Sequence, residues 1–132
     1  MIICRRMRMD TLKIIKALGD ENRLRLVNIL YEDELCGCEV EGILQMTQSN
    51  VSRHLSKLSD AKITVFRKDA KYSYYRLDGK TLKEHPMIAM TVADLRKEKI
   101  YQEDLERLSA YKTQGMSCDT IKDNLLMFST NG

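Results

Sequence analysis

The feature that most constrains the fold is a helix pattern with polar residues at its start and apolar residues along one side. Residues 47–61 read "TQSNVSRHLSKLSDA", and Thr47 is a favourable N-cap for a helix that runs to about Ala61. The apolar residues of this segment recur at helical spacing. They are Val51, Leu55 and Leu58. A short apolar helix at 40–45 precedes it, so the two helices are joined by a tight turn.

Two strand-like segments follow this helix pair. Residues 63–68 and 71–77 are rich in β-branched and aromatic residues, and Asp69-Ala70 lies between them, which predicts a hairpin. Two helices joined by a tight turn and then a basic hairpin are typical of a winged helix-turn-helix. We therefore expect a mainly α fold with a small β-hairpin.

The remaining segments are predicted to be helical. One helix is expected at 10–18, a second after the N-cap Asp20, and a long one after Pro86 that ends near Tyr111. The order is α-α-α-α-β-β-α, with an extra short C-terminal helix near 119–127. We expect one domain over residues 1–132. It divides into an N-terminal arm at 1–9, a core at 10–113 and a tail at 114–132.

Bulk properties narrow the class of protein. The longest apolar runs are too short to cross a membrane, and the start lacks the apolar stretch of a signal peptide. A cytoplasmic protein is expected, in which the four cysteines stay reduced and bind metal or react rather than form a disulfide framework. Residues 47–77 hold seven bases and two acids, an excess that favours a phosphate backbone. A solvated basic face is the plainer alternative.

The helix at 47–61 places its polar residues where a helix entering the major groove makes contacts. His54 borders the apolar face and is expected to be packed or to touch a phosphate, while the hairpin bases flank a phosphate track or the minor groove. The predicted DNA-binding residues are Gln48, Ser49, Asn50, Ser52, Arg53, His54, Lys57, Arg67, Lys68 and Lys71. Any amphipathic surface helix has a polar side and an apolar side, so this pattern alone is weak evidence for DNA binding. The basic hairpin that follows the helix strengthens the interpretation.

Cys36 and Cys38 lie just before the helix pair. On a regular helix these positions point about 200° apart, whereas in an extended segment they point the same way. Both sulfurs therefore reach one ion only if the helix start is unwound or distorted. We therefore expect a bound ion to deform the entry to the third helix and to move the DNA-reading helix packed on it. The ion would bind the deformed state better, and DNA would bind the undeformed state better. A switch requires such a difference in affinity between two states. Thiolates favour soft, thiophilic ions. The alternative is that Cys36 and Cys38 are simply small, semi-buried residues that bind no ion.

Together, "LGDENRLRLVNIL", "ELCGCEV", "TQSNVSRHLSKL" and "FRKDAKYSYYRL" resemble the ArsR/SmtB family of metal-responsive repressors. The resemblance covers roughly residues 12–78. It implies a homodimer that pairs its first and last long helices and binds double-stranded operator DNA without a cofactor. It also implies that an inducer releases the DNA. The "ELCGC" segment resembles that of the arsenite sensors and of the cadmium and lead sensors, so As(III) or Sb(III) is the expected inducer and Cd or Pb the alternative.

The identity of a third metal ligand stays open, because the position in the motif and the ligand chemistry indicate different residues. The arsenite pattern usually has a third cysteine where this chain has Glu41, a hard carboxylate. Cys4 in the N-terminal arm and Cys118 in the tail offer the right chemistry. We expect Cys36, Cys38 and Cys118 to form the metal site, with Cys4 second.

The chain departs from the family pattern at three positions where the family has glycine. Here these positions are Gln45, Lys62 and Ala70, and each residue is expected at positive φ. Other functions are a repressor whose thiols oxidise or form a persulfide, a thiol-disulfide enzyme, or a protein-binding module. An enzyme is not expected, because the chain has no Cys-x-x-Cys, no βαβ pattern and no histidine placed as a base.

Overall fold

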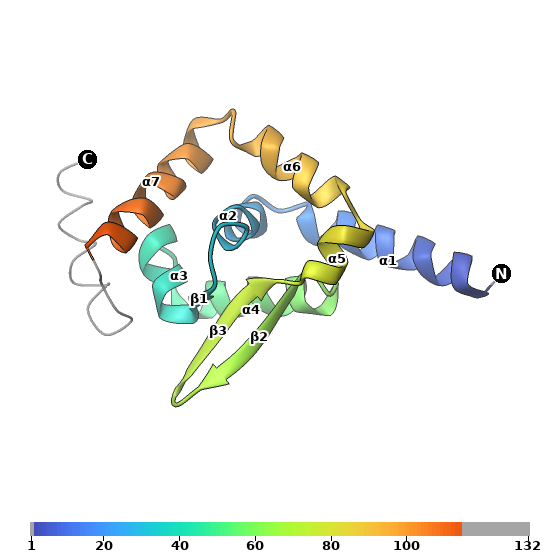
Figure 1. Ribbon diagram of the computed structural model, residues 1–132, viewed down its shortest axis with the longest axis horizontal. Coiled ribbons are helices and arrows are strands. Elements are labelled where there is room, and N and C mark those ends of the chain that lie inside the picture. Colours follow the sequence, from blue (N-terminus) through green and yellow to red (C-terminus); the bar gives the residue numbers. More distant parts are fainter. Residues whose placement is uncertain (1, 115–132) are drawn as a thin grey trace.

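The structure, a computed structural model, describes the backbone from residue 2 to 114 and side chains from residue 10 onward. Its elements run from N- to C-terminus as follows (Figure 1). They are α1 (Ile2–Leu18), α2 (Glu21–Leu30), β1 (Leu35–Cys36), α3 (Gly37–Leu44), α4 (Gln48–Asp60), β2 (Thr64–Asp69), β3 (Tyr72–Leu77), α5 (Gly79–Glu84), α6 (Met87–Leu95) and α7 (Lys99–Thr113). The predicted helix pair and hairpin are α3, α4 and β2–β3. The expected tail helix at 119–127 lies outside the described residues.

The β2–β3 hairpin projects from the helical body beside α4 (Figure 1). It belongs to a three-stranded antiparallel sheet with the order β1-β3-β2. Strand β1 was not predicted, because two residues are too few to show alternation. It pairs Leu35 with Tyr75 and Cys36 with Tyr74. The segment that carries Cys36 is thus hydrogen-bonded to the hairpin.

The core lies between α2, α3, α4 and the helices of the C-terminal half. The apolar residues of α4 are buried, as its spacing predicts, and pack with α2 and α3. The largest fully buried side chains include Leu26, Ile29, Val40, Ile43, Leu44, Leu58 and Ile88. Helix α4 is therefore held by its apolar side, and its other side is left at the surface.

Three helix boundaries differ from expectation. Helix α1 begins at Ile2 rather than at Asp10, and α3 begins at Gly37 rather than at Val40. The single long helix expected after Pro86 is two helices, α6 and α7. The turn between them contains neither glycine nor proline and is held by Arg96. Its Nε donates to Asn28 Oδ1 at 3.0 Å, and its Nη2 lies 2.6 Å from Glu32 Oε1.

The three non-glycine residues at expected glycine positions have positive φ, as predicted. The angles are 57° at Gln45, 61° at Lys62 and 56° at Ala70. Gln45 ends α3 in the left-handed conformation, and the N–H groups of Gln45 and Met46 donate to Glu41 O. Each non-glycine residue at such an angle costs roughly 1 kcal/mol.

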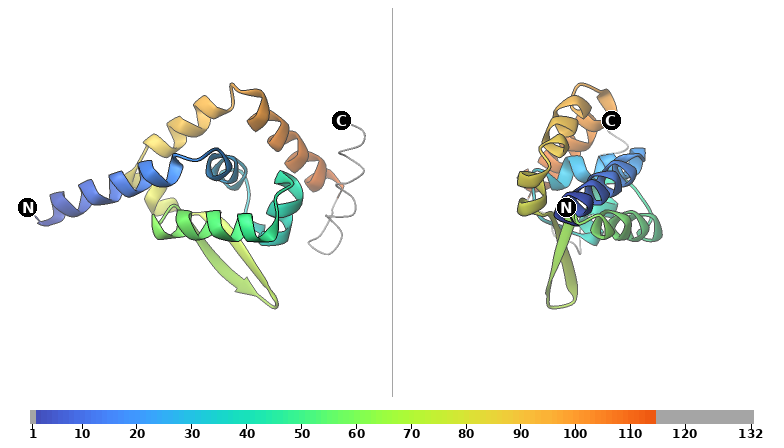
Figure 2. Two further views of the ribbon diagram at one scale, coloured as in Figure 1. Left: turned by 180° about the vertical axis from the view of Figure 1, so that it is seen from behind. Right: turned by 90° about the vertical axis from the view of Figure 1, so that its right-hand side faces the viewer.

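The N-terminal part of α1 extends away from the rest of the molecule (Figure 2). Large apolar side chains on α1 and α6 are exposed, with Leu12 at 52%, Ile15 at 51% and Met90 at 69%. No helix within the described range is both long and apolar enough to cross a membrane.

Candidate functional site

Helix α4 presents a polar surface from its first turn onward. The Thr47 side chain caps it by accepting the Asn50 N–H at 3.2 Å. Arg53 Nη2 in turn donates to Asn50 Oδ1 at 3.1 Å, which orients the guanidinium toward the start of the helix. The predicted contact residues that lie exposed on α4 are Gln48, Ser49, Ser52, Arg53 and Lys57, and Asn50 is half-buried.

His54 is buried, so of its two expected roles the structure supports packing. The residue is 3% exposed, and Nδ1 lies 3.4 Å from Arg23 Nη1 and 3.9 Å from Asp20 Oδ1. Burial lowers the pKa of His54, and the nearby Asp20 carboxylate opposes that effect only in part. The side chain joins α4 to the start of α2 and does not lie on the exposed face.

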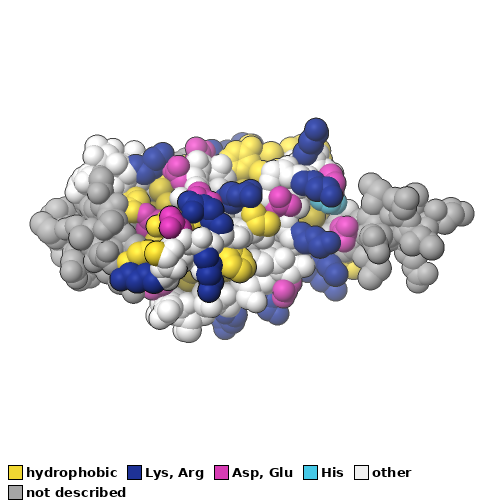
Figure 3. All heavy atoms as spheres, turned by 60° about the horizontal axis from the view of Figure 1, so that its bottom comes forward, with side chains coloured by type: hydrophobic (Ala, Val, Ile, Leu, Met, Phe, Trp, Pro, Cys, Tyr) yellow, Lys and Arg dark blue, Asp and Glu magenta, His cyan; other side chains and the backbone are white. Residues whose placement is uncertain are grey.

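The three hairpin bases are in different situations. Arg67 donates three hydrogen bonds to the Glu34 carboxylate, at 2.7 to 3.1 Å, and its guanidinium lies 4.8 Å from the Tyr74 ring centre. Lys68 is exposed, and Lys71 Nζ lies 5.2 Å from the Tyr72 ring centre. Glu34 therefore offsets the charge of Arg67. On the surface seen from below α4, lysine and arginine side chains are spread over the face, with acidic groups among them (Figure 3).

The two cysteines already meet, because Cys36 lies in the extended arrangement that was expected to bring the sulfurs together, and α3 need not unwind for this. Cys36 has φ −80° and ψ 164°, an extended conformation that makes it the N-cap of α3. Because Cys36 lies outside the helix, the helical separation of positions i and i+2 does not apply. Cys36 Sγ and Cys38 Sγ are 3.3 Å apart. For comparison, two thiolates on one tetrahedral zinc ion at about 2.3 Å have sulfurs about 3.8 Å apart.

Cys36 is buried, with 1% of its surface exposed. Its backbone N–H donates to Glu39 Oε1 at 2.8 Å, and the two residues form a capping box at the start of α3. Burial raises the pKa of the Cys36 thiol to about 12, and the nearby Glu39 carboxylate adds to the effect. The thiol is therefore protonated at neutral pH.

A cavity of about 270 Å³ opens beside the cysteines. It is lined by residues of α3, of α4 and of the hairpin. They are Cys36, Gly37, Cys38, Glu41, Gln48, Val51, Ser52, Leu55, Lys71, Tyr72, Ser73 and Tyr75. Within the described residues there is no group of three or more cysteine, histidine or acidic side chains placed to hold a metal. Cys118 and the side chain of Cys4 lie outside that range.

Two connections link the cysteines to the DNA-facing elements. Cys36 pairs with Tyr74 across β1–β3, and Tyr74 pairs with Arg67 across β3–β2. Helix α3 also packs directly on α4. Sequence reasoning missed Glu34 and Tyr74, because their partners are distant in the chain. The only sequence signal for Glu34 is that residues 32–41 hold five acids and no base.

The other end of α3 is held by a charge cluster that the sequence did not reveal. Asp104 on α7 is fully buried and accepts hydrogen bonds from Arg25 and Arg107. Arg25 also donates to Leu44 O, and Arg107 donates to Ile43 O. Helices α2 and α7 thereby fix the C-terminal end of α3, whose start carries the thiols.

This combination of a helix pair, an exposed polar helix and a basic hairpin defines a winged helix-turn-helix. The same fold is found in the homodimeric winged helix-turn-helix DNA-binding domain of Mb0332 from Mycobacterium bovis, described as a possible ArsR-family transcriptional regulator. The TM-score is 0.60 at 21% identity, and the match covers 71% of this chain and 87% of that one.

Residues 20–63 match the family model described as "Bacterial regulatory protein, arsR family". The helix-turn-helix segment of this chain is therefore similar to that of the arsR family, which agrees with the resemblance seen in the sequence.

Curated relatives match the same part of the chain. A cadmium resistance transcriptional regulatory protein CadC homolog of Staphylococcus aureus is 38% identical over 77 residues, which are 58% of this chain and 64% of that protein. The arsenical resistance operon repressor of Escherichia coli K12 is 39% identical over 67 residues, 50% of this chain and 57% of that protein. The chain thus spans little more than half the length of these relatives.

Proposed function

We propose that this protein is a homodimeric transcriptional repressor that binds operator DNA through α4 and the hairpin. A thiophilic inducer, As(III) or Sb(III), binds Cys36 and Cys38 and releases the DNA. The observation that carries the proposal is the 3.3 Å separation of the two sulfurs at the junction of β1 and α3. That junction touches both elements expected to contact DNA.

The thiols supply the chemistry that a trivalent arsenic or antimony ligand requires. When Cys36 and Cys38 are both reduced, their two thiols exchange for two hydroxyl groups of arsenous acid, which forms two As–S bonds and releases two water molecules. The sulfurs are close enough to form both bonds before any shift of α3. Cys118 is proposed as a third sulfur.

The route to DNA is proposed to run through the sheet and α3. An inducer adds volume beside the buried Cys36 thiol, and the capping box at the start of α3 then shifts. The shift passes to the hairpin through the Cys36–Tyr74 pair and to α4 through α3 packing. DNA favours the unshifted arrangement and the inducer favours the shifted one, so each weakens the other.

Dimerisation is proposed through α1 and the helices after Pro86. Leu12 and Ile15 on α1 and Met90 on α6 are all more than half exposed. Such apolar surface is suited to a second copy of the chain. A dimer also places two reading helices on one duplex, as operators with two half-sites require.

Titration of the protein–DNA complex with arsenite, antimonite, cadmium, lead and zinc, in the presence of reductant, tests the proposal. Fluorescence anisotropy of labelled DNA should show release by arsenite or antimonite at the lowest concentrations. Binding to duplex DNA that weakens steeply with salt would exclude a module that only binds protein.

A cadmium- or lead-responsive repressor is the second candidate. The observation that favours it is the cadmium resistance regulator among the relatives, at 38% identity. Release by cadmium at concentrations where arsenite has no effect would establish this function instead.

A further inference from the structure

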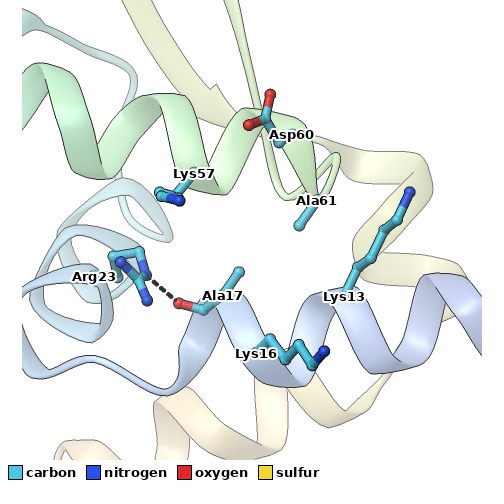
Figure 4. A pocket seen from close by; sticks show the side chains of 7 residues that line it. All are labelled: Lys13, Lys16, Ala17, Arg23, Lys57, Asp60 and Ala61. Atoms are coloured by element: carbon cyan, nitrogen blue, oxygen red, sulfur yellow. Dashed lines mark hydrogen bonds between the residues drawn. The ribbon is translucent and has the colours of Figure 1, made fainter.

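A groove between α1 and α4 collects positive charge beside the expected reading surface, with which it shares Lys57. It has a volume of about 390 Å³. Its lining residues are Lys13, Lys16, Ala17, Arg23, Lys57, Asp60 and Ala61. Ala17 and Ala61 point toward each other across the opening, and the cationic side chains surround it (Figure 4). The small alanine side chains leave the space open.

In the part of the chain that the structure describes, the three lysines of this groove have no acidic side chain paired with them. Among the described residues, no ion pair joins Lys13, Lys16 or Lys57 to a carboxylate. Arg23 donates through Nε to Ala17 O, and its Nη1 faces the His54 ring. Four cations therefore share the groove with a single carboxylate, Asp60.

The negative C-terminal ends of two helices offset part of this positive charge but not all of it. Lys16 lies in the last turn of α1 and Lys57 in the last turn of α4, where cations are favoured. Each helix C-terminus contributes about half a negative charge. With Asp60 and the Asp20 carboxylate near Arg23 included, about one positive charge remains uncompensated in the groove. An anion from outside is the remaining partner.

We propose that this groove binds a phosphate group, and that the phosphate belongs to the DNA backbone beside the reading helix. The assignment to DNA rests on the proposed function. Lys57 lies one helical turn after Arg53 on α4, and phosphates line both sides of a helix that enters the major groove. The hairpin flanks α4 on one side, and α1 with the start of α2 would contact the backbone on the other.

The groove is large enough for a phosphate with part of its hydration shell. Its volume of about 390 Å³ equals that of roughly a dozen water molecules at about 30 Å³ each. Lysine ammonium groups at its edge can approach a phosphate as mobile point charges, and the Arg23 guanidinium adds a fixed donor.

The decisive variant is Lys13→Ala combined with Lys16→Ala. Both side chains are exposed and helical, and alanine is the best helix former, so α1 should be preserved. The matched control is Lys97→Ala combined with Lys99→Ala near the start of α7. It removes the same charge from exposed, weak ion pairs. Affinity for a random-sequence duplex is measured by anisotropy as a function of salt.

Each phosphate that the variant no longer neutralises reduces the salt slope by about 0.9, so between about 50 and 200 mM salt the affinity ratio to the parent changes roughly 3.5-fold per phosphate. For a dimer in which each protomer releases one phosphate, the change is roughly 12-fold. The control should keep the parent's slope. Equal slopes for the groove variant and the control would overturn the assignment to DNA.

Titration of the DNA-free protein with inorganic phosphate tests whether the groove binds phosphate at all, independently of whether that phosphate belongs to DNA. Phosphate should shift the backbone amide resonances of Ala17 and Ala61 in the parent and not in the groove variant. Such shifts with an unchanged DNA slope would assign the groove to a small phosphorylated molecule. Absence of both effects would overturn the proposal. A parent that does not bind DNA would refute the proposed function, while the phosphate titration would still decide the groove.

Discussion

Replacing Asp104 with asparagine should strongly destabilise the fold, because this carboxylate is fully buried and holds two arginines. Its Oδ2 accepts from Arg25 Nε at 2.8 Å, and its Oδ1 accepts from Arg25 Nη2 at 2.9 Å and from Arg107. Asparagine keeps the shape but loses the charge and turns donor hydrogens toward the guanidinium groups.

Removing one partner of a buried ion pair costs about 3–5 kcal/mol. The Arg25 and Arg107 side chains remain 14% and 23% exposed, and both keep carbonyl acceptors on α3, so water can offset part of the loss. We therefore expect a decrease of about 3 kcal/mol in the free energy of unfolding. With an m-value of roughly 2 kcal/mol/M, the urea midpoint falls by about 1.5 M.

Urea unfolding followed by circular dichroism, at one protein concentration, measures this difference. The control is Asp94→Asn on α6, where the carboxylate is 76% exposed and pairs with Lys97. That change should cost less than about 1 kcal/mol. If the Asp104→Asn and Asp94→Asn midpoints agree within error, the cluster does not stabilise α3 as argued.

The remaining predictions concern DNA, pH and the third sulfur. Arg53→Ala should weaken operator binding by roughly 1–3 kcal/mol in an anisotropy assay, and unchanged affinity would show that another face reads the DNA. The raised pKa of Cys36, about 12 against 9.0 in the unfolded chain, favours folding below pH 9. That stabilisation is lost as pH rises toward the folded value, so urea midpoints should fall above pH 9 in the parent and less in Cys36→Ser. X-ray absorption at the arsenic edge should count three sulfurs in the parent and two in Cys118→Ser; three in both would assign the role to Cys4.

Much of the fold followed from local patterns in the sequence. The apolar spacing of α4, the hairpin around Asp69-Ala70 and the positive φ of Gln45 each follow from a few adjacent residues, and the structure confirms them. Strand β1 and the turn at Arg96 could not be predicted in the same way. Both depend on partners more than 35 residues away in the chain, Tyr74 and Asn28.

The geometry of the thiol pair was predicted only as two alternatives, and a local feature decides between them. A helical Cys36 would place its sulfur opposite that of Cys38, whereas the observed extended N-cap brings the two together. The Glu39 side chain on the Cys36 N–H was the available signal, since an N-cap followed three residues later by glutamate is the pattern of a capping box. Likewise, the pairing of Arg67 with Glu34 could not be read from either residue alone.

The measurement that tests the central claim most directly is arsenite-driven release of DNA from the parent and from Cys36→Ser. Serine at position 36 completes the preferred capping box with Glu39, so the variant should fold and bind DNA like the parent. Arsenite should release DNA from the parent and leave the Cys36→Ser complex intact, because a serine hydroxyl is a hard ligand. Release of both complexes at the same arsenite concentration would contradict the account.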